Sequence, residues 1–288
     1  TILTFSIPIA ITGLSEMGIY DVGPLVIGRY LPVEDAAYYT TADPIARLPL
    51  IISLSVAAVI LPAASEAASL KDKKLLETYI TQSYRYVVLL VLPICVGIAI
   101  FAQPLLSLLF DPKYIFGAPA LSILVFGMTF YTLFMVSSSI VQGIGYPRLP
   151  MYIMLVGTAI NIGLNFLMVP LYGLIGAAVA TTIVTFLIMT AILWKTIKLT
   201  GVGLPYIDFA KIGFTSIIMG LPLILLPQTY IGLFLAIIIS PIIFTIVFAV
   251  IGGFTKRDVR MLQKYGNKFG PLSGVLEIIV KFIERFAK

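Results

Sequence analysis

Long apolar stretches, each closed by a short polar or helix-breaking segment, run through the chain from end to end. Their apolar residues are continuous rather than alternating, which predicts α-helices and not the strands of a β-barrel. A bilayer core about 30 Å thick needs about 20 mostly apolar residues per helix, so we predict eight transmembrane helices. They are Ile2–Gly28, Ile45–Ala64, Val87–Leu109, Ala118–Val141, Leu149–Leu167, Gly173–Trp194, Phe209–Leu226 and Ile231–Phe254.

The segments between these spans contain residues that end helices. Proline and glycine turns are predicted at Pro32, Pro112, Gly145 to Pro147 and Pro170 to Gly173. After the last span, apolar residues from Leu272 onward recur at helical spacing, with acidic and basic residues four apart on the other face. This pattern predicts a basic amphipathic tail helix, either lying on the inner leaflet or packed against the bundle.

Composition supports a membrane protein. Of 288 residues, 60% are apolar and 11% are charged, and the mean hydropathy is +1.08. Average soluble domains are about 45–50% apolar and roughly 25% charged. The net charge of +6 could indicate nucleic acid, but the charges lie between and after the apolar runs. We therefore expect membrane lipids, and not nucleic acid, as partners.

The distribution of Lys and Arg predicts the orientation. With the N-terminus inside, 16 of the 19 basic residues fall in cytoplasmic loops and the tail. The other side has three, Arg29, Arg47 and Lys113. By the positive-inside rule, this asymmetry predicts a multi-pass plasma-membrane protein with both termini in the cytoplasm.

Several chemistries are disfavoured by what the chain lacks. It has no His and a single cysteine, Cys95, so Cys/His metal sites, His-based catalysis and a disulfide framework are excluded within it. No Ser/Lys pair, paired carboxylates or glycine-rich phosphate motif stands out, and we expect no enzyme and no cofactor. The chain begins at Thr1 without a Met or a basic segment, which we interpret as part of a longer protein and not as a signal peptide.

Ionisable residues at membrane depth are costly and indicate function by default. The first span has two, Glu16 and Asp21, in a stretch interrupted by prolines and glycines that suits a bending helix. Asp21 either takes part in a buried site or is hydrated near the interface.

Asn161 and Asn165 are four residues apart and share one helix face, while Gly173, Ala177 and Thr181 form a small-residue stripe on the next span. Together with Asp21 they supply oxygen ligands of the kind that Na⁺ prefers. The alternative is that the two Asn residues are hydrogen-bonding links between helices.

Arg47 stands at the start of the second span beside Asp43 and Pro49. A guanidinium that faces a cavity binds phosphate in a bidentate manner. The alternative interpretation of Arg47 is an interfacial anchor.

The stretch from Tyr114 to Thr182 resembles the polysaccharide-lipid flippases of the multidrug/oligosaccharidyl-lipid/polysaccharide exporter superfamily. The resemblance rests on Val141-Gln142-Gly143-Ile144-Gly145, on Ala159-Ile160-Asn161-Ile162-Gly163-Leu164-Asn165, and on Val169-Pro170-Leu171-Tyr172-Gly173-Leu174-Ile175-Gly176-Ala177-Ala178. It extends over nearly the whole chain.

The resemblance implies a division of the chain, because members of this superfamily have about fourteen helices. Residues 1–200 resemble helices seven to twelve, a six-helix transporter lobe. Residues 201–255 resemble two additional helices, and residues 256–288 form the basic cytoplasmic amphipathic tail. The first lobe is absent, so the expected partner is an N-terminal six-helix lobe or a second chain.

The resemblance also implies site residues. Relatives that flip the peptidoglycan precursor have a sodium site, and its positions correspond to Asp21, Asn161, Asn165 and Thr181, with the carbonyl of Ala177. One position that is Asp in those relatives is Asn165 here, which removes a negative charge.

We therefore expect half of an alternating-access transporter that flips a lipid-linked oligosaccharide or polysaccharide precursor. An ion gradient, of Na⁺ or H⁺, or the membrane potential would drive it. Two alternatives remain open, a drug/cation antiporter of the same superfamily and a membrane partner subunit that does not transport.

Overall fold

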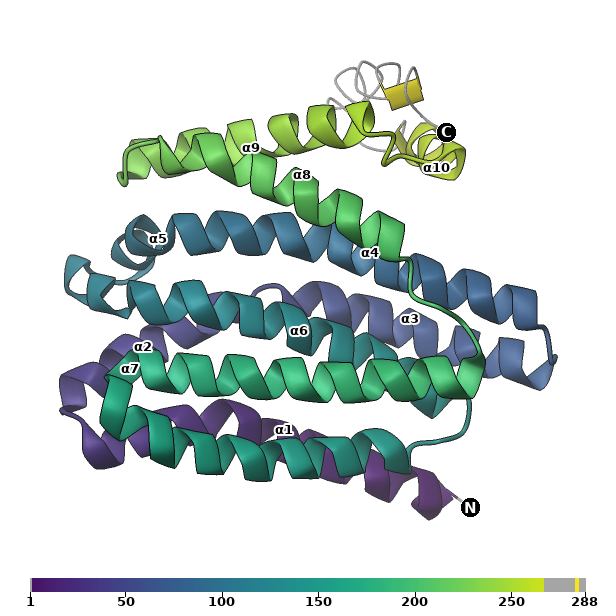
Figure 1. Cartoon of the computed structure of the whole chain (residues 1–288), viewed down its shortest axis with the longest axis horizontal. Coiled ribbons are helices and arrows are strands. Elements are labelled where there is room, and N and C mark those ends of the chain that lie inside the picture. The colour runs from purple at the N-terminus through teal and green to yellow at the C-terminus, as the bar shows by residue number, and fades with distance from the viewer. Residues whose placement is uncertain (1, 267–282, 285–288) are drawn as a thin grey trace.

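The computed structural model describes residues 2–266 and 283–284. In this part of the chain every regular element is helical, and the long helices lie side by side in a bundle (Figure 1). The predicted all-α membrane fold is confirmed. The elements are α1 (Ile2–Tyr30), α2 (Val33–Ala46), α3 (Leu50–Ser69), α4 (Lys73–Ile100), α5 (Ala102–Leu109), the 3₁₀ helix η1 (Pro112–Gly117), α6 (Ala118–Gly143), α7 (Arg148–Thr200), α8 (Tyr206–Ile224), α9 (Tyr230–Val250) and α10 (Lys256–Gly266).

Six helices of the described chain are long and apolar enough to cross a membrane: α3, α4, α6 with η1, α7, α8 and α9. The 53 residues of α7 contain two of the predicted spans, because Gly173 interrupts the helix with φ 60° and ψ −138°. Only glycine adopts such a conformation at low cost, and the two arms fold back on each other there (Figure 1). The helix of the first predicted span, α1, is not among the six.

Two predicted boundaries were wrong. The chain before the second span is helical, because α2 occupies Val33–Ala46 and α3 starts only at Leu50. The third span is divided at Phe101, where α4 ends and α5 begins. Pro104 in the first turn of α5 has no N–H for a continuing α4, so a new helix start satisfies the backbone better.

The centre of the bundle is α6, which packs against α3, α4 and α7, while α1 packs against α7. The contact between α1 and α7 is close at Gly18, where an added Cβ would lie 2.5 Å from the methyl carbon of Thr158. Thr158 also donates a hydrogen bond of 2.9 Å to the carbonyl of Ser15. Small residues at such contacts let membrane helices approach closely.

The last helices, α8 and α9, pack on one side of the bundle, chiefly against α4 and each other (Figure 1). A buried ion pair fixes the turn after α9, because Arg85 of α4 donates to Asp258 Oδ1 at 2.9 Å and to Oδ2 at 2.5 Å. Arg85 also donates to the carbonyl of Gly253 at 2.9 Å and lies 3.7 Å from Asp208 of α8. In the sequence, Arg85 is one of the 16 basic residues assigned to the cytoplasmic side, and no local pattern indicates its buried partner.

Asp258, at the start of α10, collects further donors. Tyr86 Oη donates at 2.7 Å, and the backbone N–H and hydroxyl of Thr255 donate at 2.8 and 2.9 Å. Burial raises the pKa of Asp258, but the hydrogen bonds from Arg85, Thr255 and Tyr86 outweigh burial and lower it to about 2. The carboxylate is therefore held ionised.

The predicted amphipathic tail helix lies outside the described residues except for Ile283 and Glu284. Ile283 is buried, and Glu284 accepts a hydrogen bond from Gln263 of α10. The prediction for the rest of residues 267–288 stays a prediction.

Candidate functional site

The two predicted asparagines are buried where α1 meets α7. Asn161 and Asn165 are both 0% exposed. Asn161 Nδ2 donates to the carbonyl of Ile19 on α1 at 3.0 Å. Asn165 Nδ2 donates to both Asn161 O and Asn161 Oδ1 at 2.9 Å. Asn161 therefore links α7 to α1, while both hydrogen bonds of Asn165 stay within α7.

Part of the hydrogen-bonding capacity at this place is unused. Asn165 Oδ1 and Thr181 Oγ1 are buried and accept no hydrogen bond of good geometry, although the Tyr39 hydroxyl lies close enough to Thr181 to interact with it. Thr181 is 2% exposed, and Ala177, one turn before it, is 0% exposed. A buried polar atom without a partner needs an explanation, such as an unplaced water or ion.

These oxygens meet the requirements of a hard monovalent cation. Amide, hydroxyl and carbonyl oxygens are its usual ligands, and Asn165, Thr181 and Ala177 offer one of each. No group of three or more His, Cys, Asp or Glu residues that could hold a metal occurs in the described part of the chain. The residues present therefore fit Na⁺ better than a transition metal.

Asp21 is placed differently from the other four predicted ligands. Its side chain is exposed, and within the described residues it makes no hydrogen bond or ion pair with Asn161, Asn165 or Thr181. Its electrostatic neighbour is Asp43 of α2. The structure thus joins Asn161 to Asn165 and buries Ala177 and Thr181, whereas Asp21 is exposed.

Arg47, the predicted phosphate ligand, lies at the C-terminal end of α2. It forms an ion pair with Asp43, one helical turn earlier, and its guanidinium carbon lies 3.9 Å from the ring centroid of Tyr20. The side chain is 31% exposed, and its buried Nε has no hydrogen-bond partner. Arg47 is therefore held in place by two contacts while keeping N–H groups free for an anion.

A network of aromatic hydroxyls adjoins Arg47, and sequence analysis missed it. Tyr20 Oη donates to Glu16 Oε1 at 3.1 Å, and the rings of Tyr20 and Tyr131 of α6 meet edge to face, with centroids 5.5 Å apart. The four-residue spacing of Glu16 and Tyr20 was a usable signal. Nothing in the sequence indicated Tyr131, which is more than a hundred positions away.

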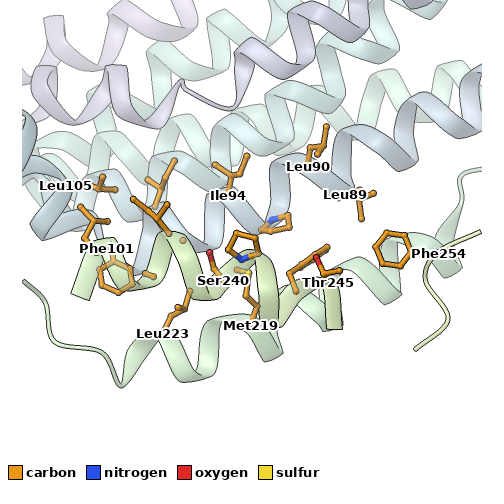
Figure 2. Close-up of a pocket in the computed structure, with 18 residues that line it drawn as sticks. Leu89, Leu90, Ile94, Phe101, Leu105, Met219, Leu223, Ser240, Thr245 and Phe254 are labelled. Atoms are coloured by element: carbon orange, nitrogen blue, oxygen red, sulfur yellow. The ribbon is translucent and has the colours of Figure 1, made fainter. Parts of the chain in front are cut away.

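An apolar cavity of about 530 Å³ lies between α4 and the α8–α9 pair. Figure 2 shows Leu90 and Ile94 of α4 facing Met219 and Leu223 of α8, with Ser240 of α9 among the few polar groups. A lining of this kind suits a hydrocarbon chain. The sequence did not indicate it, because all of these residues read as ordinary membrane-facing positions.

Comparison with known proteins adds to the geometry. A family model described as "Lipid II flippase MurJ" matches residues 7–245, which include the site residues of α1, α2 and α7. An uncharacterised membrane protein of Methanocaldococcus jannaschii is 33% identical over 164 residues, 57% of this chain and 32% of that protein. A Haloferax volcanii protein described as "Probable low-salt glycan biosynthesis flippase Agl15" is 25% identical over 158 residues, 55% of this chain and 34% of that protein. The aligned parts thus span about a third of these relatives.

Solved structures share the fold. The "Lipid II flippase MurJ, inward closed conformation" superposes with a TM-score of 0.72 at 19% identity, covering 85% of this chain and 52% of that one. The structure titled "Crystal structure of MATE in the bent conformation" gives 0.59 at 18% identity, covering 97% of this chain and 62% of that one. At these identities the likeness concerns the fold alone.

Proposed function

The chain belongs to the family of the lipid II flippase MurJ, and on that premise we propose that it forms one lobe of a transporter for a lipid-linked oligosaccharide or polysaccharide precursor. Residues 1–200 would be the six-helix lobe, and residues 201–255 would add two helices beside it. The lobe would work by alternating access against a second six-helix lobe, supplied by the same polypeptide or by another chain.

Arg47 is the observation that carries this proposal. Glycans are linked to their lipid carriers through phosphate, and a guanidinium with free N–H groups binds phosphate in a bidentate manner. Arg47 has such groups, since its side chain is 31% exposed and its ion pair with Asp43 is made through Nη2. A site for cationic drugs would gain nothing from a positive charge at this position, which favours the flippase over the antiporter.

The apolar cavity beside α4 supports a lipid substrate or a bound membrane lipid. Its volume of about 530 Å³ and its hydrocarbon lining fit an acyl or isoprenoid chain. Because α8 and α9 form one wall of this cavity and α4 the other, the two helices beyond residue 200 would serve the lipid part of the substrate together with α4, while the rest of the lobe serves its headgroup.

The unpartnered oxygens Asn165 Oδ1 and Thr181 Oγ1 support coupling to Na⁺. Asp21 would complete the site by turning inward from its exposed position. The test is the melting temperature of the purified chain in sodium chloride and in potassium chloride. Na⁺ should stabilise the parent by about 2.7 kcal/mol at 100 times its dissociation constant, and Asp21→Asn should lose this effect. Equal melting in both salts for the parent would favour proton coupling.

We propose that both termini are cytoplasmic in the plasma membrane. In support, the start of α1, the α3–α4 connection and α10 lie at the same end of the bundle (Figure 1), and Lys73 is close to that connection. In a Cys95→Ala background, a cysteine at Lys73 should resist an impermeant thiol reagent in intact cells, and one at Lys113 should react. The opposite labelling pattern would reverse the orientation.

Complementation tests the function as a whole. Residues 1–288 joined to a six-helix first lobe should restore growth of a strain that lacks its lipid-linked glycan flippase, while the chain expressed alone should not. Growth restored by the chain alone would contradict the one-lobe proposal and favour a homodimer.

A further inference from the structure

Three residues on one face of α2 connect the proposed phosphate ligand with a proposed cation ligand. Tyr39, Asp43 and Arg47 are spaced by four residues and therefore lie on the same side of the helix. Arg47 is the proposed phosphate ligand, and the Tyr39 hydroxyl interacts with Thr181, a proposed cation ligand. Asp43 lies between them, paired with Arg47 and interacting with Tyr39.

Asp43 occupies the position that a substrate phosphate would need. Its carboxylate already holds one end of the Arg47 guanidinium, and its side chain is only 12% exposed. A phosphate that binds Nη1 and Nη2 together therefore competes with this carboxylate for Nη2. A displaced, buried carboxylate without a counter-charge costs several kcal/mol, so the exchange needs a second cation.

The surroundings of Asp43 offer no other positive charge among the interactions of the described chain. Burial raises the pKa of Asp43 above its ordinary value, Arg47 lowers it, and the nearby Asp21 raises it further. Without Arg47, Asp43 would face a second carboxylate. Two carboxylates, with the Thr181 hydroxyl beyond Tyr39, make an environment that attracts a cation.

We propose that Asp43 is a positioning residue that couples phosphate binding to cation binding. It neutralises Arg47 while no phosphate is bound, and it turns toward a cation near Asp21 and Thr181 when a phosphate takes its place on Arg47. This inference rests on the proposed function, from which it takes both ligands. Its consequence is that a phosphate-linked substrate and the cation bind cooperatively, so that neither is carried efficiently alone.

Binding of inorganic pyrophosphate to the purified chain tests this coupling. In sodium chloride the dissociation constant should be lower than in N-methylglucamine chloride of equal ionic strength, by a factor within the range of roughly 5 to 150 that is usual for coupled sites. Asp43→Asn should bind pyrophosphate equally in both salts, because no charge is left to compensate. Glu34→Gln removes the same charge from an exposed position of α2 and should keep the sodium dependence. Full sodium dependence in Asp43→Asn would overturn the inference.

Two further arms separate the possible causes of failure. Sodium should lower the dissociation constant of farnesyl diphosphate by the same factor as that of pyrophosphate, because Arg47 binds the diphosphate that both ligands share. If sodium affects only the binding of farnesyl diphosphate, the sodium effect belongs to the apolar cavity and the inference is overturned. Arg47→Gln should abolish binding of pyrophosphate. If Arg47→Gln binds pyrophosphate like the parent, the proposed phosphate contact is wrong as well. If binding depends on Arg47 but sodium still lowers the dissociation constant of Asp43→Asn as it does in the parent, only the coupling is refuted.

The parent chain provides a check that needs no variant. Coupling is reciprocal, so pyrophosphate should lower the dissociation constant for Na⁺, read from sodium-dependent melting, by the same factor. Melting curves in which the two ligands act independently would overturn the inference even if Asp43→Asn does not fold.

Discussion

The buried ion pair between Arg85 and Asp258 gives the sharpest prediction on stability. Arg85→Leu removes two hydrogen bonds to the carboxylate and one to the Gly253 carbonyl, and leaves Asp258 at 7% side-chain exposure. Removing one partner of a buried pair typically costs about 3–5 kcal/mol. The lowered pKa of Asp258 gives a second estimate of this free energy. A shift from 3.8 to about 2 means that all donors together stabilise the ionised carboxylate by about 2 kcal/mol.

The loss should be local, because α10 and the turn after α9 depend on this pair more than the rest of the bundle does. Hydrogen exchange of the backbone amides at 253–260, measured on the detergent-purified chain, therefore reports it directly. A loss of about 3 kcal/mol corresponds to exchange roughly 100-fold faster in Arg85→Leu. Arg148→Leu, which removes an exposed charge, should leave these amides unchanged.

The double variant Arg85→Leu/Asp258→Leu should lose less than the sum of the single variants, since no buried charge is then left unpaired. The pKa of Asp258 is lowered in the folded chain. Its contribution is thus complete above the unfolded value of about 3.9 and is lost as the pH falls toward 2. If the losses of the single variants add up to that of the double variant, or if exchange in Arg85→Leu stays within about threefold of the parent, the proposed role of the Arg85–Asp258 ion pair is refuted.

Two further predictions concern the contact between α1 and α7. Gly18→Ala should destabilise the chain by about 1–3 kcal/mol through its clash with the Thr158 methyl group. The double variant Gly18→Ala/Thr158→Ser removes that methyl group, keeps the hydroxyl, and should recover most of the lost stability in a melting assay. No recovery would mean that the clash is not the cause of the loss. Asn165→Asp places a carboxylate against the two oxygens of Asn161, so it should melt lower than the parent without Na⁺ and gain more from Na⁺; equal sodium shifts in both would contradict the cation site.

Much of the fold was predictable because membrane spans are long and apolar. The break at Gly173 and the turn at Gly145 followed from proline and glycine alone, and Gly145 has a φ of 96°. By contrast, α2 is short, follows Pro32 and has Pro44 inside it, so its sequence resembles a loop. The helix packs against α6 and η1 and buries Tyr39 and Ala42, and no local pattern expresses this packing.

The candidate site was predictable only where its residues share one helix. The four-residue spacing placed Asn161 and Asn165 on one face, and both are buried there. The Arg85–Asp258 pair joins residues 173 positions apart, and the contact of Arg47 with Tyr20 crosses from α2 to α1. Such contacts depend on how helices pack, and sequence spacing contains no information about them.

The central claim is transport of a phosphate-linked lipid, and the most direct measurement is its translocation in liposomes. The chain is reconstituted with a six-helix first lobe, and a fluorescent lipid-linked oligosaccharide diphosphate is followed as it becomes accessible on the opposite leaflet. The account predicts translocation by the parent, a loss of roughly tenfold or more in Arg47→Gln, as expected for one charge-assisted hydrogen-bond pair, and parental rates in Glu34→Gln. Equal rates in the parent and Arg47→Gln, or export of a cationic dye without movement of the lipid, would contradict it.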